Sequence, residues 1–523
     1  MSTIPEVFTR SVRRFGSRPA LIEPRTGDEI TRLTFDMLQE QMYRFAGYLQ
    51  QQNLNKGQRI MIWSPSRIDW LISYFAAQFL GLVVVPLDVN SKEDFLRQLA
   101  TVTEATYIIT TKKLYETLQN PPLPLIDIDA LPEAPLDISK LPELNEHDLA
   151  ELVFTSGTTG QPKGVMLSHR NIVSNAIAAV EVVQITAEDR ALSILPLSHM
   201  FEMTIEIALM HAGASIVYAR SLSPDTLFRL LATQNITCMV LVPQALQLFI
   251  NGIEREVRRQ RKEKQWEILH KIAVRLPFSA RRYLFGMIHK RFGSHFRLFV
   301  CGGAHLQLQL GRRWEQMGFR VLHGYGATEC APVISVNPVN DHNLASVGKP
   351  LPGVEVRIGP GEEIQVRGSN VALGYWQNPT ATAAAFHNGW YDTGDLGYLD
   401  KRQNLYLKGR KKNLIVLPNG MNVYPEDIEN FLLNAEEIKD AVVLGLEDAK
   451  QGLSVHAVLL LEDPTQATYA KSVIQRINKR LASHQQIRGF TIWSEEDFPR
   501  THTLKVKRHD VEKILYHLRA EKK

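Results

Sequence analysis

One glycine- and hydroxyl-rich segment has residue types suited to holding a phosphate chain. Between the apolar runs 152–154 and 165–167, residues 155–164 supply three glycines, four hydroxyls and one lysine. Glycines permit a tight loop, in which backbone N–H groups, hydroxyls and an ammonium can surround a polyphosphate. The G-x-x-x-x-G-K-[ST] pattern does not fit, because Gly164 takes the Ser/Thr place, and an ordinary surface loop is the alternative. The candidate ligands are Thr155, Ser156, Gly157, Thr158, Thr159, Gly160 and Lys163.

A second segment, residues 324–329, combines an aromatic ring, a hydroxyl and a carboxylate with two glycines. Tyr325 can stack on a base, Thr328 can meet a phosphate, and Glu329 can hold Mg²⁺. A dinucleotide-binding glycine pattern is excluded, since Glu329 stands where the third glycine is required. Taken alone, such a segment is more often a structural turn than a functional site. It contributes Gly324, Tyr325, Gly326, Thr328 and Glu329 as candidates.

Two polar turns follow further along the chain. Asp395 ends the run 390–395, where its carboxylate can accept both hydroxyls of a ribose. Arg410, Lys411 and Lys412 form a cationic run at the point where the composition changes. Each is an ordinary turn or a solvated charge run unless the other segments fold beside it.

The elements between these segments indicate an α/β fold. Short apolar runs rich in Ile, Val and Tyr alternate with longer periodic stretches, which is typical of parallel strands buried between helices. Beyond residue 354, shorter segments such as 363–368 and 397–408 predict antiparallel hairpins and a small β-rich subdomain. The predicted body is 1–411, and 412–523 is a small mobile α+β domain. The predicted body strands are 58–63, 83–87, 106–110, 191–195, 215–218, 238–242, 297–301 and 320–322.

Composition narrows the class of protein. The chain has 523 residues, a net charge of +5 and three cysteines, too few for a disulfide framework. The net positive charge is too small to indicate nucleic acid as the main partner. The few cysteines indicate a reducing compartment, so a cytoplasmic location is expected. Residues 1–10 do not resemble a targeting peptide. The uncharged stretch 70–87 predicts a helix and then a strand, because Gly81 and Pro86 interrupt it.

Residues 254–297 are strongly basic, with 13 Lys or Arg against 4 Glu. Apolar residues are interleaved with these charges, so amphipathic helices are expected. One interpretation is a solvated face on helices that pack against the body. The other is peripheral contact with anionic lipid on the inner face of a membrane, and no nucleic acid partner is expected.

In this order, the motifs resemble those of the adenylate-forming superfamily, which includes acyl-CoA synthetases, adenylation domains and firefly-type luciferases. The resemblance runs from about residue 35 to residue 508. It implies that the 155–164 loop binds the β- and γ-phosphates of ATP, with Lys163 as a mobile cation. It further implies that Thr328 contacts the α-phosphate, that Glu329 and Thr155 hold Mg²⁺, and that Tyr325 stacks on adenine. Asp395 and Arg410 would then contact the ribose, and the adenine-side wall would be Gly302, Gly303 and Ala304.

The same resemblance assigns the reacting groups. His199, in the run 196–202, lies beside the acyl carboxylate, and Lys505 is the catalytic lysine. Lys412 is the hinge about which the small domain turns, while Gly420 and Asn422 lie on the CoA side. Position 504 is leucine, where many relatives have glycine, and in this it resembles the long-chain fatty acyl branch of the superfamily. Residues 415–420 depart from many relatives, which carry a lysine after the hinge isoleucine.

The expected function is ATP-dependent activation of a medium- to long-chain fatty acid to acyl-AMP, followed by thioester formation with CoA. Mg²⁺ is the expected cofactor, and apolar residues 205–210 and 246–250 are candidate walls of an acyl tunnel. A second possibility is a fatty acyl-AMP ligase, or a synthetase that passes the acyl group to an acyl carrier protein. A third is a non-enzymatic, membrane-associated binding protein that retains the fold.

Overall fold

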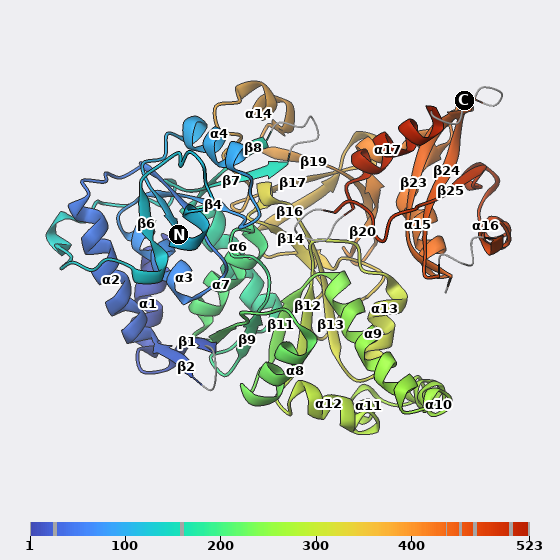
Figure 1. The fold of residues 1–523 in the computed structure, drawn as a ribbon, viewed down its shortest axis with the longest axis horizontal. Helices are drawn as coiled ribbons and strands as arrows, with labels where there is room; N and C mark the ends of the chain where they lie inside the picture. Colours follow the sequence, from blue (N-terminus) through green and yellow to red (C-terminus); the bar gives the residue numbers. More distant parts are fainter. Residues whose placement is uncertain are drawn as a thin grey trace. The chain divides into compact units, whose positions relative to one another are not determined.

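The computed structural model describes residues 2–24, 29–156, 162–435, 437–448, 452–463, 468–500 and 506–520. The chain divides into two compact units (Figure 1). Unit 1 comprises residues 1–356 and 366–391, and unit 2 comprises residues 357–365 and 392–523. The boundary at residue 412 and the mobility of the domain that follows it stay predictions. Three strands contribute residues to both units, namely β16 (Val354–Ile358), β17 (Glu363–Gly368) and β19 (Trp390–Leu399).

The larger sheet of unit 1 has nine strands in the order β15-β14-β13-β12-β11-β9-β10-β1-β2. From β13 to β1 each neighbouring pair is parallel, as the apolar runs predicted. Alternate residues face opposite sides, so Leu298 packs in one hydrophobic cluster and Phe299 in another. The strands are β1 (Pro19–Pro24), β2 (Ile30–Thr34), β9 (Arg190–Ser193), β10 (Ser215–Tyr218), β11 (Cys238–Leu241), β12 (Leu298–Cys301), β13 (Arg320–Gly326), β14 (Val333–Val336) and β15 (Lys349–Pro350).

The second sheet of unit 1 has six strands in the order β6-β5-β3-β4-β7-β8. The first five are parallel where they pair, whereas β7 and β8 form an antiparallel hairpin. That hairpin carries the predicted phosphate loop between its strands. The strands are β3 (Arg59–Trp63), β4 (Val83–Leu87), β5 (Ile108–Thr110), β6 (Leu125–Asp127), β7 (Leu149–Ser156) and β8 (Pro162–Ser168).

Helices join the two sheets through their apolar sides. The stretch 70–87 forms a helix and then a strand, as predicted, with Trp70 and Tyr74 fully buried. No helix among the described residues is both long enough and apolar enough to span a bilayer. The main helices are α1 (Ile4–Phe15), α2 (Phe35–Gln51), α3 (Ile68–Phe79), α4 (Glu93–Thr103), α6 (His169–Val183), α7 (Met200–Ala212), α8 (Pro224–Thr233), α9 (Pro243–Arg259), α10 (Glu263–Ala273), α11 (Phe278–Leu284), α12 (Gly286–Phe292), α13 (Leu308–Gln316) and α14 (Pro379–Ala385).

Unit 2 is a small α+β fold around a three-stranded sheet, β23-β24-β25. Successive residues of a strand point to opposite faces of this sheet, so Val443 packs with α15 and α16 while Val442 packs with α17. The predicted helix 469–481 is shorter, because the side chain of Asn478 bonds both backbone groups of Ile487 where α16 ends. The elements are β20 (Leu405–Arg410), β21 (Ile415–Val416), β22 (Asn422–Val423), α15 (Pro425–Leu433), β23 (Ile438–Asp448), β24 (Gly452–Leu461), α16 (Ala470–Asn478), β25 (Gly489–Ile492) and α17 (Arg508–Ala520).

Candidate active site

The β7–β8 hairpin sets the ends of the predicted phosphate loop. In its register Thr155 lies opposite Lys163, and Ser156 lies opposite Pro162. The ammonium of Lys163 and the hydroxyl of Thr155 therefore flank the start and the end of one loop. The loop candidates Gly157, Thr158, Thr159 and Gly160 lie outside the described residues.

Residues 373–376 run alongside β8 and bring an aromatic side chain to Lys163. The backbone N–H of Met166 donates to Gly374 O at 3.0 Å, and that of Trp376 donates to Gly164 O at 2.7 Å. This pairing places the ring of Tyr375 beneath Lys163, whose Nζ lies 5.0 Å from the ring centroid. That distance is within the range of a cation–π contact.

Tyr375 also contacts Glu329. Its hydroxyl donates a hydrogen bond to Glu329 Oε1 at 2.9 Å, and Glu329 O accepts from the N–H of Ala372 at 2.8 Å. Burial, and then the charge of Glu329, raise the pKa of the Tyr375 phenol, so the hydroxyl stays protonated as a donor. The same two causes raise the pKa of Tyr391. One tyrosine thus links the loop lysine to the predicted Mg²⁺ carboxylate.

Sequence reasoning missed Tyr375. The available signal was a glycine followed by two large aromatics, Gly374, Tyr375 and Trp376, shortly after an apolar pair. Gly374 has φ +132, a backbone conformation that L side chains rarely adopt. A glycine that is required for its backbone and precedes aromatic residues indicates a ring held in a fixed position.

The predicted nucleotide wall lies at one edge of the large sheet. Cys301 pairs with His323 in parallel β12 and β13, so the residues that follow both strands reach the carboxyl edge together. Gly326 ends β13, and a Cβ there would lie 2.1 Å from Pro332 O, which only glycine avoids. Tyr325 is buried at this strand end, with 9% of its surface exposed. The residues at this edge are Gly302, Gly303, Ala304, Gly324, Tyr325, Gly326, Thr328 and Glu329.

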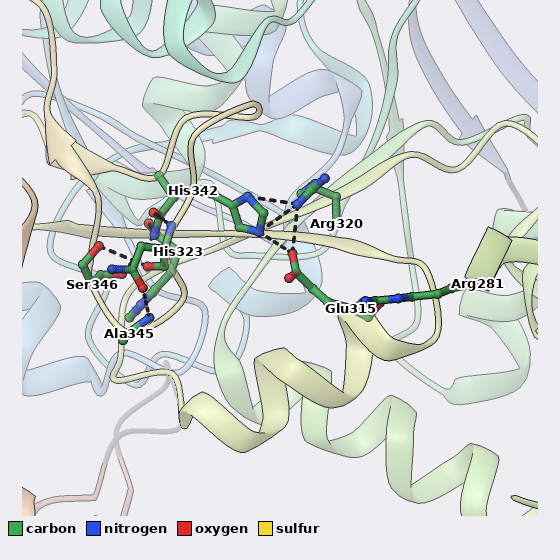
Figure 2. Close-up of polar contacts among 9 residues, drawn as sticks. Arg281, Glu315, Arg320, His323, His342, Ala345 and Ser346 are labelled. Atoms are coloured by element: carbon green, nitrogen blue, oxygen red, sulfur yellow. Dashed lines mark hydrogen bonds and ion pairs between the residues drawn. The ribbon is translucent and has the colours of Figure 1, made fainter. Parts of the chain in front are cut away.

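A buried neutral histidine supports this edge. His323 forms hydrogen bonds with the backbone of Ala304 and of Ser346, and burial lowers its pKa to about 3. Figure 2 shows His323 and Ser346 close together, and the carbonyl of His323 accepts from the N–H of Asn337 at 3.0 Å. Because His323 stays neutral, it fixes the backbone of Ala304 without placing a charge near the site.

His199 begins α7 and lies close to the same wall. Its Nδ1 accepts a hydrogen bond from the N–H of Phe201 at 3.4 Å, so the neutral ring carries its proton on Nε2. A Cβ on Gly302 would lie 2.8 Å from the ring of Phe201. The structure therefore brings the His199 segment and the start of the 302–304 wall into contact within unit 1.

Asp395 and Arg410 belong to unit 2. They face each other in the β19–β20 register, and Arg410 Nε lies 3.1 Å from Asp395 Oδ1. Asp395 is 7% exposed. Thr393 accepts the Asp395 N–H at 3.1 Å and fixes the turn that carries the carboxylate. The pair holds a nearly buried carboxylate beside a cation, a suitable arrangement for two neighbouring hydroxyls.

The other residues predicted for the small domain lie on turns of unit 2. Lys412 lies in a short 3-10 helix, Lys411–Asn413. Gly420, with φ +78, turns the hairpin between β21 and β22, and Asn422 begins β22. Gly420 and Asn422 are both exposed.

Lys505 lies outside the described residues, but both flanks of its segment are described. Arg500 pairs with Val506 in an antiparallel bridge, and the N–H of Lys507 donates to Pro499 O at 2.8 Å. Arg500 Nη2 lies 2.6 Å from Asp440 Oδ2, and Arg508 forms an ion pair with Glu429. The two described flanks of the Lys505 segment are therefore paired with each other and held to unit 2 by arginines.

Comparison with known proteins identifies this arrangement. The AMP-binding enzyme profile matches residues 8–376, and the AMP-binding enzyme C-terminal domain matches residues 412–517. The chain belongs to the AMP-binding enzyme family. The match confirms the predicted adenylate-forming fold and enzyme, and it begins nearer the N-terminus than the predicted resemblance at residue 35.

Curated relatives and solved structures agree with this family. The long-chain-fatty-acid–CoA ligase FadD15 of Mycobacterium bovis is 29% identical over 517 residues, 86% of each chain. The long-chain-fatty-acid–CoA ligase of Escherichia coli O157:H7 is 28% identical over 88% of this chain and 86% of that one. O-succinylbenzoate coenzyme A synthetase of Bacillus subtilis, solved with ATP and magnesium ion, is 26% identical with a TM-score of 0.78, covering 97% and 99% of the chains.

Proposed function

We propose that this AMP-binding enzyme activates a medium- to long-chain fatty acid with ATP and then transfers the acyl group to CoA, releasing AMP and pyrophosphate. The enzyme class that the sequence predicted, an AMP-forming acyl-CoA ligase, is confirmed by the family and by relatives named as such ligases. The observation that carries the proposal is the Lys163, Tyr375 and Glu329 arrangement. It places a cation over the face of one ring and a carboxylate at the hydroxyl of the same ring, which suits the binding of a metal-bound triphosphate.

The first step needs negative charge to be stabilised as pyrophosphate leaves. The acyl carboxylate attacks the α-phosphorus, so charge grows on the transferred phosphoryl group and on the leaving group. In the proposal Lys163 and the 155–160 loop hold the β- and γ-phosphates, and Thr328 contacts the α-phosphate. His199 orients the attacking carboxylate through its Nε2 proton. In the proposal, the main contribution to catalysis is electrostatic stabilisation of the transition state by these positioned groups.

The residues present fit a magnesium ion. Glu329 Oε1 accepts one bond from Tyr375, and a carboxylate has further lone pairs for a metal. Mg²⁺ in such enzymes is held by one or two protein oxygens together with phosphate oxygens, so Glu329 and the hydroxyl of Thr155 are suitable ligands. When bound, the ion supplies positive charge against the phosphate oxygens.

The second step depends on unit 2. In the proposal Lys505 stabilises the adenylation transition state, and rotation about Lys412 then brings the face with Gly420 and Asn422 to the acyl-AMP. A hinge only absorbs a change of backbone dihedral angles, so Lys412 needs no chemical role. Asp395 and Arg410 hold the ribose. The cytoplasmic location stays a prediction.

Apolar residues of α7 and α9 are the candidate acyl wall. Ile207 and Met210 of α7 are buried in the first hydrophobic cluster, and Leu246 and Ile250 of α9 are buried in the second. These side chains favour an alkyl chain over a polar substrate because burying methylenes beside them is favourable. The names of the relatives support a long chain.

An acid panel tests the substrate and the acceptor together. Acids from acetate to palmitate are compared by exchange of labelled pyrophosphate into ATP, and AMP release is measured with CoA, with an acyl carrier protein and with neither. We expect exchange that peaks at medium to long chains and a thioester only with CoA. Exchange without CoA-dependent release would support the carrier-protein alternative, for which the unusual 416–420 loop leaves room. No exchange with any acid would contradict the proposal.

Substitution of Lys505 separates the two steps. Lys505→Ala should abolish pyrophosphate exchange while thioester formation from supplied acyl-AMP remains. Lys507→Ala is the matched control, a lysine two residues further along the chain, and should leave exchange unchanged. Loss of thioester formation alone in Lys505→Ala would contradict the assignment.

A further inference from the structure

The helices α10, α11 and α12 expose large apolar side chains on a strongly basic segment. Tyr283 is 86% exposed, Met287 78%, Val274 58%, Ile268 54% and Ile272 42%. Singly exposed apolar residues are normal on a protein surface, but five within one short segment are not. The three helices lie together at the lower edge of unit 1 in Figure 1, and α11 packs beside both α10 and α12.

Helix geometry puts cations and apolar side chains on the same side of α10. At 100° per residue, Lys264, Ile268, Lys271 and Ile272 share one face, and the exposure of all four confirms it. The opposite face carries Trp266, Leu269 and Ala273, which pack in the second hydrophobic cluster. Packing against the body therefore accounts for the inner face only, and leaves the outer isoleucines unexplained.

Two basic residues of this segment form hydrogen bonds that hold the fold together and do not face outward. Figure 2 shows Arg281 extending from α11 toward Glu315 of α13, where its Nη1 donates to Glu315 O at 3.1 Å. Arg282 donates to Phe296 O at 3.2 Å. These two arginines hold α11 in place, so they are excluded from the candidate surface.

Four other cations of this segment face outward. Within the part of the chain that the structure describes, Lys264, Lys271, Arg275 and Lys290 form no ion pair. Phe285 at the N-cap of α12 and His289 and Phe292 within it recur at helical spacing and are buried, so Met287 and Lys290 lie on the outward side. Their positive charge is therefore available to an anionic partner.

We propose that this outward face docks onto a bilayer that contains anionic lipid. The surface, called here the basic apolar face, comprises Lys264, Ile268, Lys271, Ile272, Tyr283, Met287 and Lys290. Cations attract anionic headgroups, while isoleucine, methionine and tyrosine side chains enter the boundary of the acyl region. A second copy of the chain fits less well, because two such faces repel each other. Exposed aliphatic side chains have no role on a phosphate backbone, which disfavours nucleic acid.

Vesicle sedimentation of the full chain tests the proposal without any substrate, so its outcome does not depend on the proposed ligase activity. We expect the protein to pellet with phosphatidylcholine vesicles that contain phosphatidylglycerol and to remain in the supernatant with phosphatidylcholine alone. Raising the salt concentration should weaken binding, because it screens exposed charges. Equal recovery with both vesicles, or no binding to either, would overturn the proposal.

Two double variants separate the two contributions. Ile268→Ser with Met287→Ser, and Lys264→Gln with Lys271→Gln, should each lower the fraction bound by about fivefold or more. Ile138→Ser with Lys112→Gln is the control, since both positions are exposed elsewhere in unit 1. Circular dichroism checks that each variant is folded. Undiminished vesicle binding of folded variants, or self-association or DNA binding that these substitutions abolish, would overturn the proposal.

Discussion

The hydroxyl of Tyr375 donates to Oε1 of Glu329 at 2.9 Å, although 46 residues separate them in the chain. The contact exists because residues 373–376 add to the edge of β8, which also carries Lys163. A single ring thus touches the lysine of the phosphate loop on its face and the carboxylate through its hydroxyl. In the proposed site, this geometry would hold both charged groups in place before ATP binds, and such preorganisation is what electrostatic catalysis requires.

The hydroxyl of Tyr375 can be removed without its ring. Tyr375→Phe retains the cation–π contact but leaves Glu329 without this donor. Hydrogen bonds to charged groups contribute about 1.5–3 kcal/mol, so kcat/KM for pyrophosphate exchange should fall by about tenfold or more. The concentration of Mg²⁺ needed for half-maximal rate should rise. Tyr115→Phe, which loses a hydroxyl bond to Leu123 O, is the control and should change neither quantity. Unchanged exchange in Tyr375→Phe would show that the hydroxyl of Tyr375 has no role in the site.

The close approach at Gly326 predicts a second effect. In Gly326→Ala the new Cβ would lie 2.1 Å from the backbone oxygen of Pro332, so the chain leading to Thr328 and Glu329 must shift. We expect ATP-dependent exchange to fall by about 100-fold, because a displacement of about 1 Å at reacting groups has that effect. Gly252→Ala in α9 has nothing within 4 Å of its Cβ and should be neutral or stabilising by up to about 1 kcal/mol. Exchange kinetics and thermal unfolding of both variants check this pair.

The fold was predictable where the signal is local. Runs such as 238–242 are apolar throughout, because parallel strands covered on both faces exclude charge, and they form β11 and its neighbours in the structure. The turns at 324–329 and 390–395 were recognisable because glycine and hydroxyl residues cluster there. The order of these motifs along the chain then indicated the family.

Contacts between distant segments were not predictable in this way. Nothing near Tyr375 in the sequence indicates Glu329, because the pairing of 373–376 with β8 is decided by the tertiary fold. His323 is another example, since a histidine in an apolar run does not reveal that it will support the backbone of Ala304. The buried glutamates of unit 2 and of α7 were missed for a related reason. A glutamate on a helix is expected to be solvated, and only packing shows otherwise.

Arg508 lies three residues after Lys505 in the chain, and it balances a buried carboxylate. Burial raises the pKa of Glu429 to about 7, and the Arg508 guanidinium, which also donates to Val443 O at 2.9 Å, opposes this rise. Arg508→Ala should lower the free energy of unfolding of unit 2 by about 3 kcal/mol, because it leaves Glu429 without its partner. Adding Glu429→Gln should restore part of that loss. Arg476→Ala, which removes an exposed pair with Glu437, should cost less than about 1 kcal/mol. Urea unfolding distinguishes these outcomes, and equal losses for both arginines would contradict the argument.

Two glutamates on α7, directly after His199, are buried together. Glu202 is 2% exposed and accepts from the hydroxyl of Ser193, while Glu206 is 1% exposed and accepts from the hydroxyl of Tyr218. One carboxyl oxygen of each is buried with no hydrogen-bond partner among the described residues. Burial raises the pKa of Glu202 to about 8, and burial followed by the charge of Glu202 raises that of Glu206. Glu202 is therefore largely protonated at neutral pH.

This pair predicts a pH dependence with a definite sign. The folded state binds the Glu202 proton more tightly than the unfolded state, whose pKa is about 4.5, so stability is complete below that value and falls as the pH rises toward 8. Glu202→Gln keeps an acceptor for Ser193 and cannot ionise. Its free energy of unfolding relative to the unsubstituted chain should therefore increase with pH, by up to about 1.4 kcal/mol per pH unit. Urea unfolding at several values between pH 5 and 8 measures this difference. Glu181→Gln, an exposed position on α6, should show none, and a parallel pH profile for Glu202→Gln would mean that Glu202 is ionised in the folded protein.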